Sequence, residues 1–235
     1  MRALPKLERL RLGHLKRREK DIRFIASSNP MDVQQTALWE VNLFLSTDGF
    51  LRGIAAPNLK ALRVHRGSVS IDEVAALAPN LDLLRLSNVI TGWSKIKLPL
   101  EEKQTRPLVL ELVNVSGGDD VVALLSKRIT QLVIESGVYL FEQEVHKILT
   151  NEMTRLERFH IFCDSSYWSL VEKKDKCSAM LDKAVNLLQN RRLLPNLKHV
   201  QLGNWSPLHK PIKAELDRRA PGSLPVFEFV GTEWE

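Results

Sequence analysis

The chain has 235 residues and a formal net charge of +6, and this length allows one or two domains with a continuous hydrophobic core. Residues 1–23 contain nine Lys or Arg and three Asp or Glu, so they carry the whole positive excess. The remainder is neutral, which argues against a generally basic, nucleic-acid-binding fold. Two cysteines exclude a disulfide framework and are typical of a reducing compartment, so we expect a cytoplasmic or nuclear protein. No uncharged apolar run approaches the ~20 residues that a membrane helix needs, so we expect no membrane partner.

An apolar phrase, Leu-x-x-Leu-x-Leu with Ile, Val or Phe allowed at its apolar positions, recurs along the chain. The clearest copies follow Pro-Asn, at residues 57–64, 79–86 and 195–202, and a looser copy occupies residues 5–12. The units begin at Leu7, Leu59, Leu81, Pro107, Ile129, Leu156, Leu197 and Leu224. Most successive starts lie about 20–29 residues apart, which is the period of leucine-rich repeats. Each unit therefore predicts one short strand of a parallel sheet.

Apolar residues with helical spacing predict helices between these strands. Near the N-terminus we expect a short strand at residues 21–25 and a helix over residues 33–45. The next helix begins at a capping box formed by Ser70 and Glu73. Further helices are expected after the Gly-Gly pair at 117–118, around residues 141–149, over residues 177–188 and at residues 211–216.

These elements predict an α/β fold, an irregular leucine-rich-repeat solenoid with a curved parallel sheet on its concave face and helices on its convex face. We expect residues 1–235 to form a single solenoid domain, in which residues 1–30 are a degenerate repeat. A solenoid needs a polar cap over its first repeat, and none precedes the first strand. We therefore hypothesise that the chain is an N-terminally truncated piece of a longer protein.

The Pro-x-Leu-x-x-Leu-x-Leu units, their irregular lengths and the charged residues between the leucines resemble the leucine-rich region of fungal and plant F-box proteins. The resemblance covers residues 5–229. It implies that the repeats hold the protein substrate of a cullin-type ubiquitin ligase. The nearest echo of an F-box opening, Leu98-Pro99-Leu100-Glu101-Glu102, lacks the apolar helices of that module. A ligase adaptor is thus expected as a partner only if an F-box lies outside this chain.

The residues between the apolar positions of each unit should point outward from the concave face and meet a protein ligand. An arginine row on a rigid sheet suits the capture of carboxylates or phosphates. The opposing interpretation is an ordinary solvated strand face on a purely structural scaffold. The candidate partner-binding residues are Arg9, Arg11, Arg63, Arg85, Glu111, Arg158, His160, His199 and Gln201.

No motif in the sequence predicts catalysis, a cofactor or a metal, so we do not expect an enzyme. His160 and Cys163 are followed by Asp164, but a metal site needs a second pair of ligands and none is evident. An alternative function is nucleic-acid or anionic-surface binding through the basic N-terminal segment, which includes Lys16-Arg17-Arg18-Glu19-Lys20. Acidic residues interrupt that segment and no aromatic residues interleave with it, so a solvated loop is favoured over nucleic-acid binding.

Overall fold

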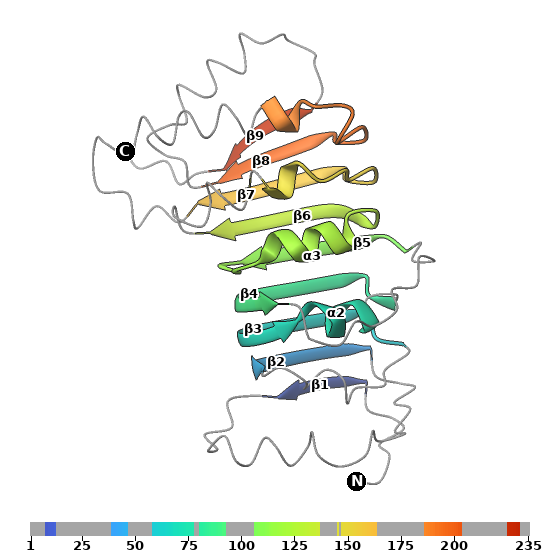
Figure 1. The fold of residues 1–235 in the computed structure, drawn as a ribbon, viewed down its shortest axis with the longest axis vertical. Coiled ribbons are helices and arrows are strands. Elements are labelled where there is room, and N and C mark those ends of the chain that lie inside the picture. The colour runs from blue at the N-terminus through green and yellow to red at the C-terminus, as the bar shows by residue number, and fades with distance from the viewer. Residues whose placement is uncertain are drawn as a thin grey trace, which may run out of the picture.

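The computed structural model describes residues 8–12, 39–46, 58–77, 80–92, 106–136, 145, 147–163, 186–203 and 225–230. These residues form one nine-stranded parallel sheet in which the spatial order of the strands is their order in the chain (Figure 1). The strands are β1 Arg9–Leu12, β2 Glu40–Ser46, β3 Ala61–Ser70, β4 Leu83–Gly92, β5 Leu108–Val113, β6 Ile129–Ser136, β7 Arg158–Cys163, β8 His199–Gly203 and β9 Val226–Val230. The fold is therefore α/β with an all-parallel sheet.

Strand β2 is the one strand of this sheet that lies outside the expected units. The helix predicted for residues 33–45 is wrong where the structure describes that segment, because residues 40–46 are extended. Val41 and Leu43 are buried while Asn42 and Phe44 are partly exposed, which is the alternation of a strand. Leu38-Trp39-Glu40-Val41-Asn42-Leu43 fits the repeat phrase, and its start lies 21 residues before that of the next unit. This copy of the repeat phrase was missed because Leu38, Val41 and Leu45 in the same segment also have helical spacing.

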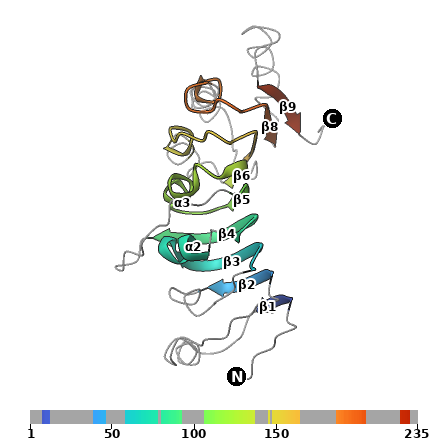
Figure 2. The same cartoon turned by 90° about the vertical axis from the view of Figure 1, so that its right-hand side faces the viewer.

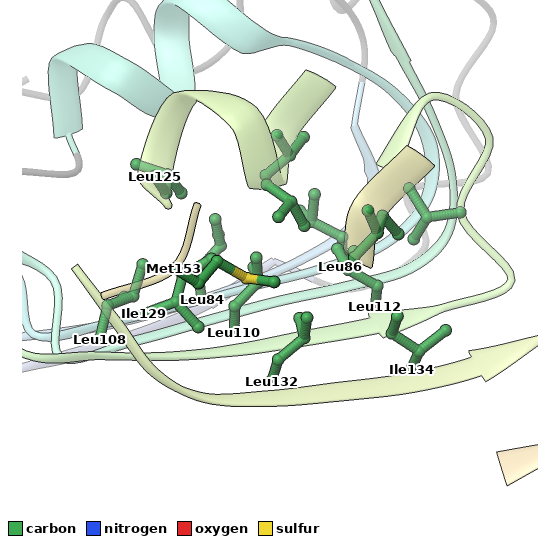
Figure 3. Packing of buried hydrophobic residues seen from close by; sticks show 14 of the residues in the cluster. Leu84, Leu86, Leu108, Leu110, Leu112, Leu125, Ile129, Leu132, Ile134 and Met153 are labelled. Carbon is green, nitrogen blue, oxygen red and sulfur yellow. The ribbon is translucent and has the colours of Figure 1, made fainter. Parts of the chain in front are cut away.

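The core forms where the leucines of successive units stack in register. Leu62 is the register partner of Leu84, and Leu84 is the register partner of Leu110. All three are completely buried. Figure 3 shows the inward side chains of β4, β5 and β6 pointing toward the side of the sheet where Leu125 of α3 lies. Each fully buried leucine contributes about 1.5–3 kcal/mol, so this column stabilises the pairing of successive strands.

Two helices lie on the same side of the sheet (Figure 2). They are α2 Ile71–Leu77 and α3 Gly118–Leu125. Helix α2 begins directly after Ser70, where the capping box predicts it. Helix α3 follows Gly117, whose φ of 77° places it in the left-handed region that glycine tolerates. Val121 and Leu125 turn into the core, as the predicted helix face requires.

The remaining predicted elements are described only in part. Helical turns occur at residues 147–149 and 186–188, inside two of the expected helices, and Ile148 and Leu188 are buried there. The predicted strand at residues 21–25, the helix at residues 211–216 and most of the helix at residues 177–188 lie outside the described residues.

A buried arginine joins three consecutive units at the edge where the strands begin. Arg128, 2% exposed, donates from Nε to the carbonyl of Arg106 at 3.0 Å and from Nη2 to the carbonyl of Leu81 at 2.8 Å. Its own carbonyl accepts from the amide of Leu108 at 3.0 Å. Burial lowers the pKa of Arg128 from its ordinary value, and the carboxylate of Asp82 acts in the opposite direction. Nothing in the repeat phrase marks this residue in advance.

Candidate partner-binding face

The face of the sheet opposite α2 and α3, called the open face below, carries the side chains that alternate with the core residues. Strand pairing aligns these side chains in two rows that run across all nine strands. The first row is Arg9, Glu40, Ala61, Leu83, Val109, Gln131, Arg158, His199 and Val226. The second row is Arg11, Asn42, Arg63, Arg85, Glu111, Val133, His160, Gln201 and Glu228. All nine candidate residues from the sequence lie in these rows, and Arg63 and Arg85 are register partners on adjacent strands.

Glu40 is the centre of an ion-pair cluster at the N-terminal end of the open face. Its Oε2 lies 3.4 Å from Nε of Arg9, and its Oε1 accepts from Nη1 of Arg63. Asn42 donates from Nδ2 to the same Oε1 at 3.2 Å. The guanidinium of Arg9 also lies over the ring of Trp39, 4.4 Å from its centroid. Glu40 and Asn42 were missed in the sequence because their segment was assigned to a helix.

The arginines in the middle of the second row are therefore not bare cations. Arg85 is paired through Nη1 with Oε2 of Glu111 at 3.2 Å, on the following strand, whereas Arg63 is paired with Glu40, on the preceding strand. Within the described part of the chain, neither Arg11 nor Arg158 makes an ion pair with a carboxylate. Arg11 instead lies 5.1 Å from the ring centroid of Phe44. Alternating charges make this end of the face a patterned network rather than a uniformly basic stripe.

His65 lies beside this network, two residues after Arg63 on β3 and therefore one row further along the open face. Its ring stacks on Phe44 with 4.8 Å between centroids and an interplanar angle of 16°. Burial lowers the pKa of His65, and the guanidinium groups of Arg85, Arg63 and Arg11 lower it further. The imidazole is consequently neutral at pH 7, where it can accept as well as donate a hydrogen bond.

Apolar side chains occupy the middle of the open face. Leu83 of β4, Val109 and Val113 of β5 and Val133 of β6 are all partly exposed there. Leu83 and Val109 are register partners, and Val133 lies opposite Glu111, diagonally between Val109 and Val113. The four side chains therefore form an apolar band around Glu111, between the charged N-terminal end and the polar C-terminal end. A partly exposed apolar band with polar surroundings is the pattern of a protein interface.

The C-terminal end of the open face is hollowed between β7 and β8. A cavity of about 510 Å³ is lined by Glu157, Arg158, His160, Lys198, His199 and Gln201. An ion pair between Lys198 and Glu157 at 3.2 Å borders it, and Nε2 of His199 lies 3.0 Å from Oε2 of Glu228. The rings of His160 and His199 meet edge to face with centroids 6.1 Å apart.

The environment of His160 favours its neutral form. Burial lowers the pKa of His160 most, His199 and Arg158 lower it further, and Glu228 acts in the opposite direction. The neutral imidazole retains one N–H donor and one acceptor nitrogen.

No group of three or more His, Cys, Asp and Glu residues within the described ranges could hold a metal ion. Among the same residues, no helix has the length and apolar character required to span a bilayer. The basic cluster at residues 16–20 lies outside the described residues. The chain matches no protein-family model, and no curated protein and no solved structure shows significant similarity to it.

Proposed function

We propose that the chain is a leucine-rich-repeat solenoid that recognises a protein partner through its open face, in the way that the substrate-binding region of an F-box protein does. The observation that carries the proposal is the apolar band of Leu83, Val109, Val113 and Val133, set between two ends rich in charged and polar side chains. Such an arrangement places apolar contacts at the centre of an interface and polar contacts at its rim.

The dimensions of the open face support this role. Nine strands about 4.8 Å apart give a length of about 38 Å, and strands of about five residues give a width of about 17 Å. The resulting area of about 650 Å² is close to the ~800 Å² that each partner contributes to a standard protein interface. The paired arginines add specificity, because a partner has to match an alternating pattern of charges.

The proposal is tested by capturing partners from the native host with the full chain and comparing variants. Arg85→Glu reverses one charge on the face, and Lys127→Glu reverses an exposed charge in the turn after α3 as the matched control. We expect Arg85→Glu to reduce the specifically captured proteins by about tenfold or more, since like charges brought together at an interface cost several kcal/mol. Lys127→Glu should leave them unchanged.

Two further observations separate the parts of the proposal. Val133→Asn places a polar side chain in the apolar band without adding a charge opposite Glu111, and it should also abolish capture. If circular dichroism shows both face variants folded and the captured proteins are the same, recognition through the open face is wrong. If partners are captured but the full-length gene product brings down no cullin adaptor or ligase subunit, the F-box part of the proposal fails and recognition remains.

A further inference from the structure

Strand β1 has an edge with which no described strand pairs. Within the described part of the chain it pairs with β2 alone. The carbonyl of Glu8 accepts a hydrogen bond from the amide of Glu40 at 3.3 Å, which directs this carbonyl toward β2. Because backbone groups alternate in direction along a strand, the amides of Arg9 and Arg11 point away from β2. An edge of this kind is a template for a further strand.

Strand β9 presents the opposite edge of the sheet. Among the described strands it pairs only with β8, and the amide of Val226 donates to the carbonyl of Lys198 at 2.8 Å. The backbone groups of Phe227 therefore point away from β8. Val226 and Val230 are 61% and 40% exposed. The strand, Val-Phe-Glu-Phe-Val, contains none of the lysines or prolines that commonly protect an edge from pairing.

The hydrophobic core is incompletely covered at both ends of the sheet. Leu10 on β1 and Phe227 on β9 pack against the core but are only partly buried. Their register partners, Val41 and Val200, are completely buried. Each unit of a solenoid buries its apolar side chains against the units on both sides of it, so the terminal strands lack one such neighbour.

The two ends also carry complementary charges in the second row of the open face. Arg11 on β1 forms no ion pair with a carboxylate in the described ranges, and Glu228 on β9 forms none there with a lysine or arginine. Nε2 of His199 lies 3.0 Å from one oxygen of Glu228. A carboxylate accepts several hydrogen bonds, so this contact leaves capacity for a further donor.

We propose that the open edge of β9 pairs in parallel with the open edge of β1 from a second copy of this chain, so that the two sheets continue as one. In the register that the rows follow, Leu10 of the second copy becomes the partner of Phe227, and its Arg11 becomes the partner of Glu228. An apolar pair then extends the core, and a pair of opposite charges lies on the open face. This inference does not depend on what the open face binds.

An extended peptide from an unrelated protein could also add to β9, as in other cases of strand addition to a sheet edge. Such a peptide would satisfy the backbone of β9 and leave the edge of β1 open. A second copy accounts for more of the observations. Its β1 supplies the backbone donors, the apolar side chain of Leu10 and the cation of Arg11 in one register, and one contact uses both open edges.

The contact between two ends is small. A strand of about five residues spans about 17 Å and packed layers lie about 10 Å apart, so each end offers less than the ~800 Å² of a standard interface. Association should therefore be weak and depend on concentration. Each pair of copies retains one open β1 edge and one open β9 edge, so growth continues beyond two copies unless a ring closes.

The experiment follows self-association of the full chain by sedimentation velocity over a wide range of concentration. We expect a series of species, monomer, dimer and longer, that shifts toward the longer ones as concentration rises. Arg11→Glu places a carboxylate beside Glu228 of the next copy and should weaken association roughly tenfold. Arg158→Glu makes the same change of charge at an exposed arginine within the same face, so it is the matched control and should leave association unchanged.

Mixing two variants separates the contact itself from effects of net charge. Arg11→Glu and Glu228→Arg each bring like charges together at the junction, so each variant alone should associate weakly. In an equal mixture the ends of the two variants are complementary, and association should return to that of the unchanged chain. Hydrogen exchange at the amides of Arg9 and Arg11 should slow in the associated state of the unchanged chain. This measurement needs no substitution, so it tests the contact even where a variant does not fold.

Several results would overturn the pairing of β1 with β9. These are a chain that stays monomeric at every concentration, a mixture of folded variants that does not restore association, and exchange at the amides of Arg9 and Arg11 that association leaves unchanged. Equal weakening by Arg158→Glu and Arg11→Glu would assign the effect to net charge. Growth that stops at a dimer, weakened by Val133→Asn and not by Arg11→Glu, would assign the contact to the open faces of two copies.

Discussion

Replacing Arg128 by methionine removes the guanidinium that joins three consecutive units of the sheet. The charged hydrogen bonds that disappear include those to the carbonyls of Leu81 at 2.8 Å and Arg106 at 3.0 Å. Hydrogen bonds to charged groups contribute about 1.5–3 kcal/mol each, and methionine recovers some of this by filling the space with an apolar chain. We therefore expect the free energy of unfolding to fall by about 3 kcal/mol, a large share of the ~5–15 kcal/mol of a typical domain.

This change is measured by urea denaturation, and a thermal scan should show a loss of about 6–12 °C for a chain of this size. Lys127→Met is the matched control, because it removes an exposed cation from the preceding position, and it should shift stability by less than about 0.5 kcal/mol. A loss below about 1 kcal/mol for Arg128→Met would mean that desolvating the guanidinium costs as much as its bonds return. The account of Arg128 as a stabilising link would then be wrong.

Two further predictions concern the backbone and pH. Gly117→Ala should destabilise the chain by about 1–3 kcal/mol in the same denaturation assay, because φ is +77° and a Cβ would lie 2.6 Å from Oγ1 of Thr91. Gly92→Ala is the control: its added Cβ would have no heavy atom within 4 Å, so stability should change by less than about 0.5 kcal/mol. Burial and, next, Arg85 lower the pKa of His65 below its ordinary 6.5, so the folded state binds this proton less readily than the unfolded chain. Stability should consequently fall as the pH drops through about 6.5 toward the folded-state value, and His65→Gln should reduce that slope in denaturation curves at pH 7 and pH 5. An unchanged slope in the variant would contradict the pKa direction.

The repeat phrase predicts where most of the strands lie, and aligning its copies predicts which residues of neighbouring strands are register partners. Aligning Leu59 with Leu81 also aligns Arg63 with Arg85, and the structure pairs those two residues. The same alignment brings Arg158 beside His199 although 41 residues separate them. The prediction from the repeat phrase failed around Val41. Leu38, Val41 and Leu45 have the spacing of a helix, whereas Val41 and Leu43, two residues apart, have the spacing of a strand.

Interactions across the open face were not predictable from the phrase. Arg85 is paired with Glu111, and this pairing needs the register of two strands together with side-chain conformations that a sequence does not specify. Arg128 precedes a strand in the same way as many surface residues do, and only the packed structure shows that its turn is buried. The cavity between β7 and β8 likewise depends on how four separately predicted side chains converge.

The sequential order of the sheet has a consequence for how such a chain can change over generations. Each strand from β2 to β8 pairs with the strands that come just before and just after it in the chain. The units between Leu59 and Leu156 start 22–27 residues apart. Duplication or deletion of one unit would lengthen or shorten the open face by the spacing between two strands, about 4.8 Å. Each of the remaining strands would keep at least one of its original neighbours. The length of the open face can thus change by gain or loss of a unit, while the residues that it presents to a ligand change separately, by point substitutions.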